Sequence, residues 1–330
     1  MKFNFKNKTI LITGGTGSFG QALVSYFCNT KNKPKKIIVF SRDELKQYDM
    51  GKLFDKKKFS NIRYFLGDIR DKDRLKLAIK DVDVVVHAAA LKQVDTSEYN
   101  PFEFIKTNVI GSQNIVETCL DSKVKNVIAL STDKASSPIN LYGATKLCAD
   151  KLFTGANNVK GKQDINFSVV RYGNVMGSRG SVLFNFFEQK KKGYINITDN
   201  EMTRFNINMN EAIDFVINSI NNSKGGEIFV PKIPSFYITD LAKAVCPSCK
   251  IKIIGIREGE KIHEEMISSN ESQRTIDLGN YYAILNSYAA VRYEDKKYLG
   301  RNFSYSSNNN KNFLTVEQLK KIIRNFPKKN

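Results

Sequence analysis

Five short apolar segments in the first half of the chain alternate with longer segments whose apolar residues recur at helical spacing. The apolar segments span residues 9–13, 36–40, 82–87, 126–131 and 166–172. They are apolar almost throughout rather than at alternate positions, which is typical of parallel strands covered by helices on both faces. The pattern therefore predicts an α/β fold with a doubly wound parallel sheet of the Rossmann type.

The second half of the chain is less regular and predicts a smaller C-terminal lobe. A helix near 210–221 and a strand over 227–230 are expected to rejoin the sheet, and residues 250–256 form another β-branched segment. Thr239 has the residue type that caps helices, so we expect it to begin a helix over 240–245.

The chain ends with the pattern of an amphipathic helix. Thr315 and Gln318 have the spacing of a capping box, and Leu319, Ile322 and Ile323 follow on one helical face. Ligands bind at the carboxyl edge of doubly wound sheets, so we expect the C-terminal lobe to cover that edge.

Composition excludes several classes of protein. The 330 residues are 41% hydrophobic, which suffices for a large core and excludes a disordered chain. Without a bilayer-length apolar run or a secretory apolar core, we expect a soluble cytoplasmic protein with no membrane partner. The 52 basic residues against 33 acidic ones are spread along the chain without interleaved aromatics, which favours a solvated surface over a nucleic-acid partner.

Five cysteines form an odd and mostly scattered set. Cys246 and Cys249 have metal-ligand or redox spacing, but a zinc site needs about four ligands, and His87 and His263 lie in other motifs. We therefore expect no metal, and we interpret Cys246–Cys249 as a loop with two ordinary thiols in a reducing compartment.

A glycine-rich turn follows the first predicted strand and precedes a helix. Its glycines would let the backbone turn sharply and approach a pyrophosphate, whose charge the helix N-terminus favours. The segment that we expect to hold a dinucleotide comprises Gly14, Thr16, Gly17, Ser18, Phe19 and Gly20.

The residues after the second predicted strand favour NADP. Ser41 and Arg42, with Lys46 one turn later, suit the 2′-phosphate, where NAD-binding proteins usually place a carboxylate. An acidic residue directly after Arg42 leaves NAD as the alternative. Asp68 and Ile69 are interpreted as adenine contacts, although Asp68 is also in place to cap a helix.

Tyr142 and Lys146 form the predicted chemical centre. Four residues apart, they share a helix face, and the lysine would favour the phenolate by lowering the tyrosine pKa. Such a tyrosine accepts a proton from a carbinol while a hydride leaves for nicotinamide. Thr132, ten residues earlier at a strand end, is in place to hold the same hydroxyl.

With these motifs the chain resembles the extended short-chain dehydrogenase/reductase superfamily over nearly its whole length. Within it, the chain is most similar to the inverting UDP-N-acetylglucosamine 4,6-dehydratases in their short soluble form. The segments that carry this closer resemblance are 41–47, 88–92, 130–146, 171–181, 203–205, 227–234 and 253–264.

The resemblance implies a division of the chain and an assembly. It implies an NADP-binding Rossmann domain formed by residues 1–173 and 206–234, and a substrate-binding lobe formed by 174–205 and 235–330. It also implies a homo-oligomer that assembles through the helices near 104–120 and 143–153.

Asp133 and Lys134 separate members of the superfamily. The sugar 4-epimerases have small or hydroxylic residues here, and the retaining dehydratases have Asp-Glu. Dehydration needs a base for the C5 proton and an acid for the departing C6 hydroxyl. The resemblance implies that Asp133 is the acid and that Lys134 is the base, provided that desolvation and neighbouring lysines depress its pKa. The alternative role for Lys134 is a substrate-positioning cation.

The implied reaction begins when Tyr142 takes the O4 proton as NADP oxidises C4. Lys134 then removes the C5 proton, Asp133 assists the loss of water from C6, and the hydride returns to C6. Reprotonation of C5 from the opposite face, by Lys134 or Tyr142, gives UDP-2-acetamido-2,6-dideoxy-beta-L-arabino-hexos-4-ulose for surface or flagellin glycans of the pseudaminic-acid type. Another nucleotide-sugar dehydratase or an epimerase is the alternative.

The resemblance also implies the binding residues for UDP-N-acetylglucosamine. Ala88 would face the cofactor, and Lys92 would lie between cofactor and sugar. Gln93 and Asp95 depart from the usual pattern of the family and put the identity of the substrate in question; for each arginine, a surface ion pair is the alternative. The implied contacts are Lys92, Asn174, Arg179, Gly180, Ser181, Val182, Thr198, Arg204, Arg257 and Glu260.

Overall fold

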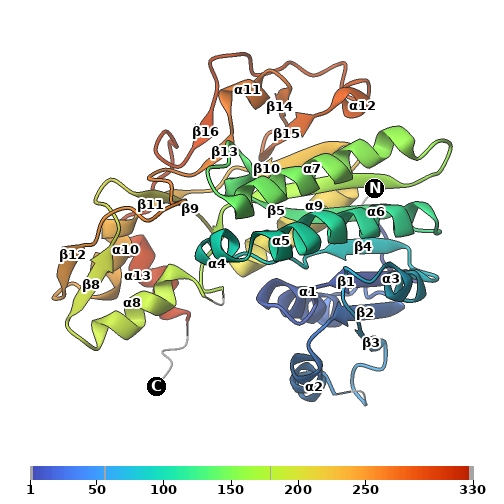
Figure 1. The fold of residues 1–330 in the computed structure, drawn as a ribbon, viewed down its shortest axis with the longest axis horizontal. Coiled ribbons are helices and arrows are strands. Elements are labelled where there is room, and N and C mark those ends of the chain that lie inside the picture. Colours follow the sequence, from blue (N-terminus) through green and yellow to red (C-terminus); the bar gives the residue numbers. More distant parts are fainter. Residues whose placement is uncertain (1–2, 56, 179, 327–330) are drawn as a thin grey trace.

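The computed structural model describes residues 3–55, 57–178 and 180–326, and a nine-stranded sheet forms its centre (Figure 1). The strand order is β14-β15-β10-β6-β5-β4-β1-β2-β3. At one edge, β15 (Tyr281–Leu285) and β14 (Thr275–Asp277) run antiparallel to their neighbours. The parallel strands are β1 (Thr9–Thr13), β2 (Lys36–Ser41), β3 (Ile62–Leu66), β4 (Val84–His87), β5 (Asn126–Thr132), β6 (Asn166–Tyr172) and β10 (Glu227–Pro231).

Helices cover both faces of the sheet, as the apolar strands predicted (Figure 1). Every residue of β1 and of β10 is buried. The prediction of a doubly wound α/β fold is therefore confirmed. On one face α1 (Ser18–Asn29) packs against α9 (Met209–Asn222), and on the other α6 (Gly111–Leu120) lies between α3 (Lys72–Ile79) and α7 (Leu141–Val159).

The parallel strands bring residues from distant parts of the chain to one edge. Thr13 pairs with His87 across β1 and β4, and Thr132 pairs with Tyr172 across β5 and β6. The strand order reverses at β1, because β2 lies on one side of it and β4 on the other. Such a switch point leaves a crevice at the carboxyl edge, where doubly wound proteins bind ligands.

A second apolar core forms the smaller lobe, which lies at the left of Figure 1. Buried members include Leu183, Ile195, Phe236, Leu241 and Leu319. The predicted capping box at the start of α13 is present. The elements of this lobe are α8 (Val182–Lys190), β8 (Tyr194–Ile197), α10 (Ile238–Val245), β12 (Lys250–Ile253) and α13 (Val316–Arg324).

Short elements connect the two cores. A three-stranded sheet with the order β11-β9-β7 lies between them. Before α6 the chain forms two short helices and one π-helical turn, which suits a functional region. The remaining elements are α2 (Glu44–Leu53), α4 (Val94–Tyr99), α5 (Pro101–Phe104), η1 (Ile105–Ile110), η2 (Asp133–Ala135), β7 (Asn174–Val175), β9 (Thr203–Ile207), β11 (Ser235–Tyr237), β13 (Glu265–Ile267), α11 (Ser269–Ser272), α12 (Ser287–Ala290) and β16 (Tyr305–Ser306).

Three expectations for the second half of the chain need correction. Residues 275–285 extend the large sheet, whereas the expected boundary put all of 235–330 in the lobe. The helix expected over 240–245 begins at Ile238, so Thr239 lies in its first turn and does not cap it. The β-branched segment 250–256 is a strand only as far as Ile253, and this strand pairs with β8.

Cys246 and Cys249 form a disulfide. The interpretation of this loop as two ordinary thiols is therefore wrong. Cys246 is buried at the end of α10, so the bond links the helix to the loop that leads into β12. The three remaining cysteines are free.

Arg171 connects three distant segments and is completely buried. Its guanidinium donates to Asp150 of α7 at 3.1 Å, to Glu271 of α11 at 3.0 Å and to the carbonyl of Met266 at 3.0 Å. A buried charge is tolerated when it is paired and hydrogen-bonded. These contacts hold the segment 266–271 against the carboxyl end of β6.

None of the described helices combines the length and the apolarity needed to span a bilayer.

His87 predicts a pH-dependent stability. Burial lowers the pKa of His87 to about 3, and its ring nitrogens contact Thr13 and Ser112. The unfolded chain, with a histidine pKa of about 6.5, binds one more proton below that pH. The unfolding free energy should therefore fall by about 1.4 kcal/mol per pH unit on lowering the pH from about 6.5 to 5.

Urea unfolding at several pH values in this window measures the slope. His87→Gln should lower the slope by the His87 contribution, while His263, whose pKa burial also lowers, contributes equally in both proteins. An equal slope in both proteins would assign it to other groups.

Candidate functional site

A cavity of about 650 Å³ opens at the carboxyl edge of the sheet. Its walls come from the glycine turn after β1, the ends of β2 and β5, the residues after β3, β4 and β6, and the start of α7. Of the predicted site residues, it brings together Gly14, Thr16, Gly17, Ser18, Phe19, Gly20, Ser41, Arg42, Lys46, Asp68, Ile69, Ala88, Lys92, Thr132, Tyr142, Lys146, Asn174 and Gly180.

The glycine turn can accept a dinucleotide because glycine stands at positions where any side chain would collide with neighbouring backbone atoms. Gly14 has a φ of +64°, and a Cβ there would lie 2.8 Å from the Ala89 nitrogen. A Cβ on Gly20 would lie 2.5 Å from the backbone of Gly15, so that α1 packs directly on the turn. The N-terminus of α1, at Ser18, is thus adjacent to the cavity, in the arrangement that suits a pyrophosphate.

Polar groups surround the end of β2. Thr16 donates to the Ser41 hydroxyl at 3.1 Å. The exposed Arg42 side chain lies 3.9 Å from Asp68, whereas Lys46 is paired with Asp43. Asp43, which left NAD open as the alternative, caps α2 in addition.

Asp68 belongs to an ion-pair network. It accepts hydrogen bonds from the Arg70 backbone at 2.9 Å and from the Arg70 guanidinium at 2.7 Å. Burial would raise the pKa of Asp68, but the Arg70 hydrogen bonds and the Arg42 charge outweigh it and lower the pKa. Asp71, not Asp68, caps α3, so the cap interpretation of Asp68 is wrong.

Tyr142 and Lys146 lie on α7 and reach the cavity beside Thr132. Burial raises the pKa of Tyr142 to about 12, although the Lys134 charge and a hydrogen bond with Thr132 act to lower it. Lys146 donates instead to the Leu130 carbonyl at 2.6 Å. The expectation that Lys146 lowers the tyrosine pKa is therefore wrong for this structure, in which Lys134 has that effect.

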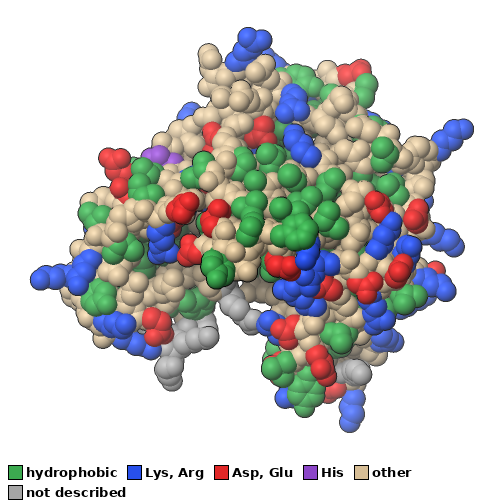
Figure 2. Space-filling model, in the orientation of Figure 1, with side chains coloured by type: hydrophobic (Ala, Val, Ile, Leu, Met, Phe, Trp, Pro, Cys, Tyr) green, Lys and Arg blue, Asp and Glu red, His purple; other side chains and the backbone are tan. Residues whose placement is uncertain are grey.

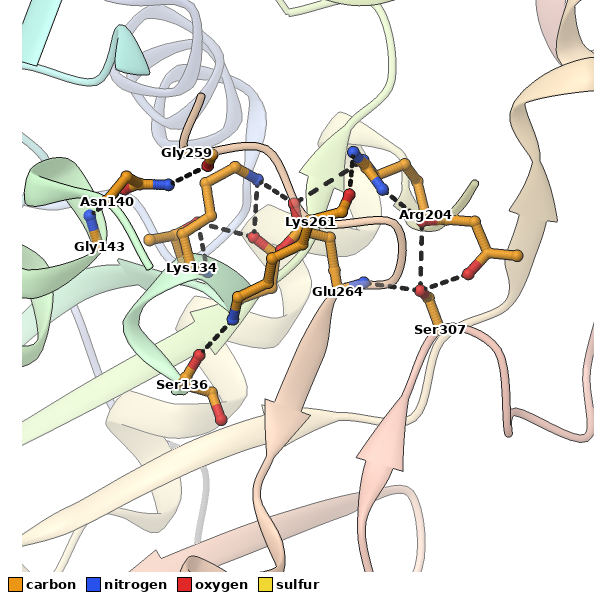
Figure 3. Close-up of polar contacts among 12 residues, drawn as sticks. Lys134, Ser136, Asn140, Gly143, Arg204, Gly259, Lys261, Glu264 and Ser307 are labelled. Carbon is orange, nitrogen blue, oxygen red and sulfur yellow. Dashed lines mark hydrogen bonds and ion pairs between the residues drawn. The ribbon is translucent and has the colours of Figure 1, made fainter. Parts of the chain in front are cut away.

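Asp133 and Lys134 follow Thr132 at the end of β5 and lie in the short η2 helix. Neither is among the described residues that line the cavity. Asp133 is fully buried and accepts from the Thr132 hydroxyl at 2.9 Å. The Lys134 ammonium lies 3.2 Å from Asp133. It also lies 2.8 Å from Glu264 (Figure 3). The site thus has one amine between two carboxyl groups.

The resting charge of Lys134 differs from the expectation. Burial alone would lower the pKa of Lys134, but the carboxylates of Asp133 and Glu264 outweigh burial and raise it. Lys134 is therefore an ammonium in this structure, and the expectation of a depressed pKa is wrong. Burial also raises the pKa of Asp133, with a contribution from Glu264, which favours its protonated form.

Residues 257–264 form a strap over the end of β5, visible in Figure 3. The strap is tied down at both of its ends. Asn140 donates to the Gly259 carbonyl and Lys261 to the Ser136 carbonyl, each at 2.7 Å. Arg204 donates to the carbonyls of Lys261 and Ile262 at 2.9 Å. These contacts place Glu264 beside Lys134.

The predicted substrate residues do not all face the cavity. Asn174 and Gly180 do, and Arg179 lies outside the described residues. Ser181 and Val182 begin α8, and Thr198 is buried after β8. Arg204 is also buried. Its guanidinium donates to backbone carbonyls, among them those of the strap, and does not face open solvent.

The two remaining substrate residues lie at the start of the strap. Arg257 is exposed and stands 4.0 Å from Asp95, one of the positions that depart from the family pattern. Glu260 has a buried carboxyl oxygen without a hydrogen-bond partner among the described residues. Any anion bound by Arg257 would therefore compete with Asp95, at an exposed and hence weak ion pair.

Sequence reasoning missed Glu264 as a functional candidate. It is 2% exposed, and its ion pair with Lys134 spans 130 residues of chain. The available signal was the run of charged residues 257–265 within a segment that already carried the family resemblance. Nothing in the spacing shows which of these charges turns toward β5.

Comparisons with known proteins identify the family of the chain. The chain matches the polysaccharide biosynthesis protein family over residues 10–286. It is 51% identical to a UDP-N-acetylglucosamine 4,6-dehydratase (inverting) of Campylobacter jejuni, over 97% of this chain and 98% of that protein. It is 42% identical to a UDP-glucose 4-epimerase of Rickettsia bellii, over 98% and 97% respectively. The crystal structure of Pen from Bacillus thuringiensis superposes with a TM-score of 0.89 and 38% identity, covering 98% of this chain and all of that one.

The Rossmann-type sheet, the glycine turn and the Thr132–Tyr142–Lys146 set define a protein of the short-chain dehydrogenase/reductase class. The chain belongs to the polysaccharide biosynthesis protein family, and within it to the group that contains the inverting UDP-N-acetylglucosamine 4,6-dehydratases. The family resemblance derived from the motifs is thereby confirmed.

Proposed function

We propose that the chain dehydrates UDP-N-acetylglucosamine at C4 and C6 with inversion at C5, using NADP, as a carbon–oxygen lyase. The product is UDP-2-acetamido-2,6-dideoxy-beta-L-arabino-hexos-4-ulose. The observation that carries the proposal is a buried acid and an amine, Asp133 and Lys134, adjacent to Thr132 and Tyr142 at the cavity. Relatives about half identical over nearly the whole length bear the name of this activity.

The residues around the glycine turn fit a dinucleotide. Gly14 and Gly20 leave room for close backbone approach, and Ser41 with Arg42 would hold the 2′-phosphate of NADP. Asp68, Ile69 and neighbouring residues would hold the adenine side. Bound NADP would accept a hydride from C4 and return it at C6. NADP rather than NAD is favoured by Arg42, whose side chain is 53% exposed and pairs with Asp68 only at 3.9 Å.

Tyr142 would accept the O4 proton, and Thr132 would hold the same hydroxyl. Because burial raises the pKa of Tyr142 to about 12, its phenol is protonated at rest. Proton acceptance is therefore favoured by a nearby positive charge, which the Lys134 ammonium supplies. The hydrogen bond that Lys146 donates to the Leu130 carbonyl orients the Lys146 side chain.

Asp133 would protonate the departing C6 hydroxyl and Lys134 would remove the C5 proton. A buried carboxyl with a raised pKa is suited to the acid role. The Lys134 ammonium must lose a proton before it acts as a base. Glu264, at 2.8 Å, would receive it, because Asp133 in its acid form already carries a proton.

The sugar nucleotide would occupy the part of the cavity between the Rossmann domain and the lobe. Lys92, Asn174 and Gly180 line it from the Rossmann side and the start of the lobe. Arg257 would bind the pyrophosphate in place of Asp95. Further contacts are proposed for Arg179, Ser181, Val182, Thr198, Arg204 and Glu260.

We also propose a cytoplasmic homo-oligomer, and exposed apolar side chains support the assembly. Figure 2 shows hydrophobic side chains gathered over the middle of the face that carries α5, α6 and α7. Tyr99 is 87% exposed, Phe102 61% and Ile110 49%. Contiguous apolar surface of this kind marks a protein–protein interface. Lys and Arg side chains on this face are scattered rather than gathered in one stripe, which argues against a nucleic-acid partner.

Incubation with UDP-N-acetylglucosamine and NADP in deuterium oxide, followed by NMR, tests the function. We expect a 4-keto-6-deoxy product of L configuration with deuterium at C5, because C5 loses its proton and regains one from the opposite face. A product of D configuration would identify a retaining dehydratase. A UDP-sugar inverted at C4 without loss of water would identify an epimerase instead.

Removal of Arg42 tests the choice of cofactor. Arg42→Ala should weaken NADP binding about 10- to 100-fold and leave NAD binding nearly unchanged, because a charged hydrogen bond to the 2′-phosphate is lost. Titration with each dinucleotide, followed by fluorescence, measures both affinities. Arg70→Ala removes a neighbouring arginine of the same network as the control. Equal weakening toward NADP and NAD in Arg42→Ala would contradict the assignment.

Lys134→Ala tests the base. NADP affinity should persist, while turnover should fall by about 10²- to 10⁴-fold, the usual contribution of a general base. Calorimetry and the NMR assay give the two readouts. Lys125→Ala, at an exposed ion pair with Asp164, serves as the control. Substantial turnover in Lys134→Ala would exclude the role.

A further inference from the structure

Two buried carboxyl groups share one ammonium beside the cavity. Lys134 Nζ lies 2.8 Å from Glu264 Oε1 and 3.2 Å from Asp133 Oδ1 (Figure 3). Asp133 is 0% and Glu264 2% exposed, so water cannot stabilise their charges. Where two carboxylates face one cation in a dry site, one of them keeps a proton far more readily than it would in water.

The surroundings decide which carboxyl group carries the negative charge. Glu264 has the shorter contact with Lys134 and a second cation, Arg204, at 3.7 Å. Asp133 has the longer contact with Lys134 and no second ion pair, and each carboxyl group keeps one oxygen, Asp133 Oδ2 and Glu264 Oε2, without a partner among the described residues. The negative charge therefore belongs on Glu264.

The pKa directions agree with this geometry. Burial would raise the pKa of Glu264, but Lys134 and Arg204 outweigh it and lower the pKa. Burial raises the pKa of Asp133, and the Glu264 charge raises it further, against the opposing effect of Lys134.

We propose that Glu264 is the counter-ion of Lys134 and thereby leaves Asp133 in its acid form, ready to donate the proton that the departing C6 hydroxyl needs. Glu264 is thus a positioning residue that acts through Lys134 and Asp133. The inference deepens the proposed function and rests on it for the identity of the reaction.

The proton of Asp133 is in place for this donation. A Cβ on Gly173 would lie 3.3 Å from Asp133 Oδ2, so this oxygen faces a residue that lines the cavity. In the elimination the Asp133 O–H bond breaks and the proton joins the C6 oxygen. The Lys134 ammonium first transfers a proton to Glu264. The resulting amine takes the C5 proton, the pair released from the C5–H bond forms the C5–C6 double bond, and the C6–O electron pair leaves with water.

Glu264 is held in place by groups that do not depend on its charge. Its backbone nitrogen donates to Ser307 Oγ at 2.9 Å, and the Ser307 nitrogen donates to the Glu264 carbonyl at 2.7 Å. Arg204 and Lys261 fix the strap just before it. A glutamine at 264 should therefore keep the fold while it removes the charge.

The charged and titratable groups that act on this pair come from several elements. Asp133 faces Lys134 within η2, Tyr142 of α7, and Glu264 and Lys261 of the strap. Glu264 faces Lys134, Arg204 of β9 and Lys261. Removal of the Glu264 charge leaves Lys134 without its nearest anion, and Asp133 then becomes the anion that pairs with it.

Infrared spectroscopy tests the protonation state without any substrate. The protein should show the C=O stretch of a buried carboxylic acid at neutral pH, and Asp133→Asn should remove it. Glu264→Gln should also remove this band, because Asp133 then ionises, while Glu264→Asp should retain it. A band that persists unchanged in Glu264→Gln would overturn the proposal, whatever reaction the protein catalyses.

The pH dependence of turnover tests the consequence. Glu264→Gln should bind NADP and unfold like the parent protein, with KM little changed. Its decline in kcat at high pH should begin about one pH unit or more lower, so that kcat on that limb falls about tenfold or more and recovers as the pH is lowered. Glu264→Asp should restore the parent profile. Glu265→Gln, which removes the neighbouring carboxylate that accepts from Ser137, is the matched control and should keep the parent profile.

A merely structural role gives a different result. In that case Glu264→Gln would lower kcat by the same factor at every pH, or leave kcat unchanged, and either result would overturn the proposal. A failure of the proposed function is distinguishable, because the parent protein itself would then give no 4-keto product while the infrared result would still stand.

Discussion

Buried charge at the carboxyl ends of β5 and β6 holds the C-terminal half of the chain against the sheet. Arg171 is fully buried and joins β6 to α7 and to the segment 266–271. Arg204 donates to the carbonyls of the strap, which precedes that segment in the chain. A buried guanidinium without partners would be costly, so each of these contacts constrains the others. Segments 100 residues apart in sequence are thereby fixed next to the proposed catalytic residues.

The same constraint gives the site its charge pattern. Lys134 cannot remain buried beside β5 without an anion, and the strap supplies Glu264 in addition to the adjacent Asp133. One cation between two carboxyl groups favours one proton on the pair. Acid and amine thus acquire different roles from their surroundings, although they are neighbours in the chain and follow the same strand.

Local pattern was sufficient for much of the fold and for half of the site. The strands of the parallel sheet were predicted because burial on both faces requires apolar runs, and α13 because its capping box is local. The glycine turn and the residues at strand ends were predicted because parallel strands end at one edge. The charge states of Tyr142 and Lys134 were predicted wrongly, because that of Tyr142 depends on burial and that of Lys134 on Glu264, which is 130 residues away in the chain.

The sequence by itself determined the α/β class, the dinucleotide turn, the order Thr132-Asp133-Lys134 and the family, since these depend on residues within one strand, turn or helix. The tertiary structure alone decided that 275–285 joins the sheet, that Cys246 and Cys249 are bonded, that Arg204 binds the strap and that Glu264 faces Lys134. The physical reason is that a charge acquires its partner, and hence its pKa, from whatever the fold packs against it, and spacing along the chain carries no record of that contact.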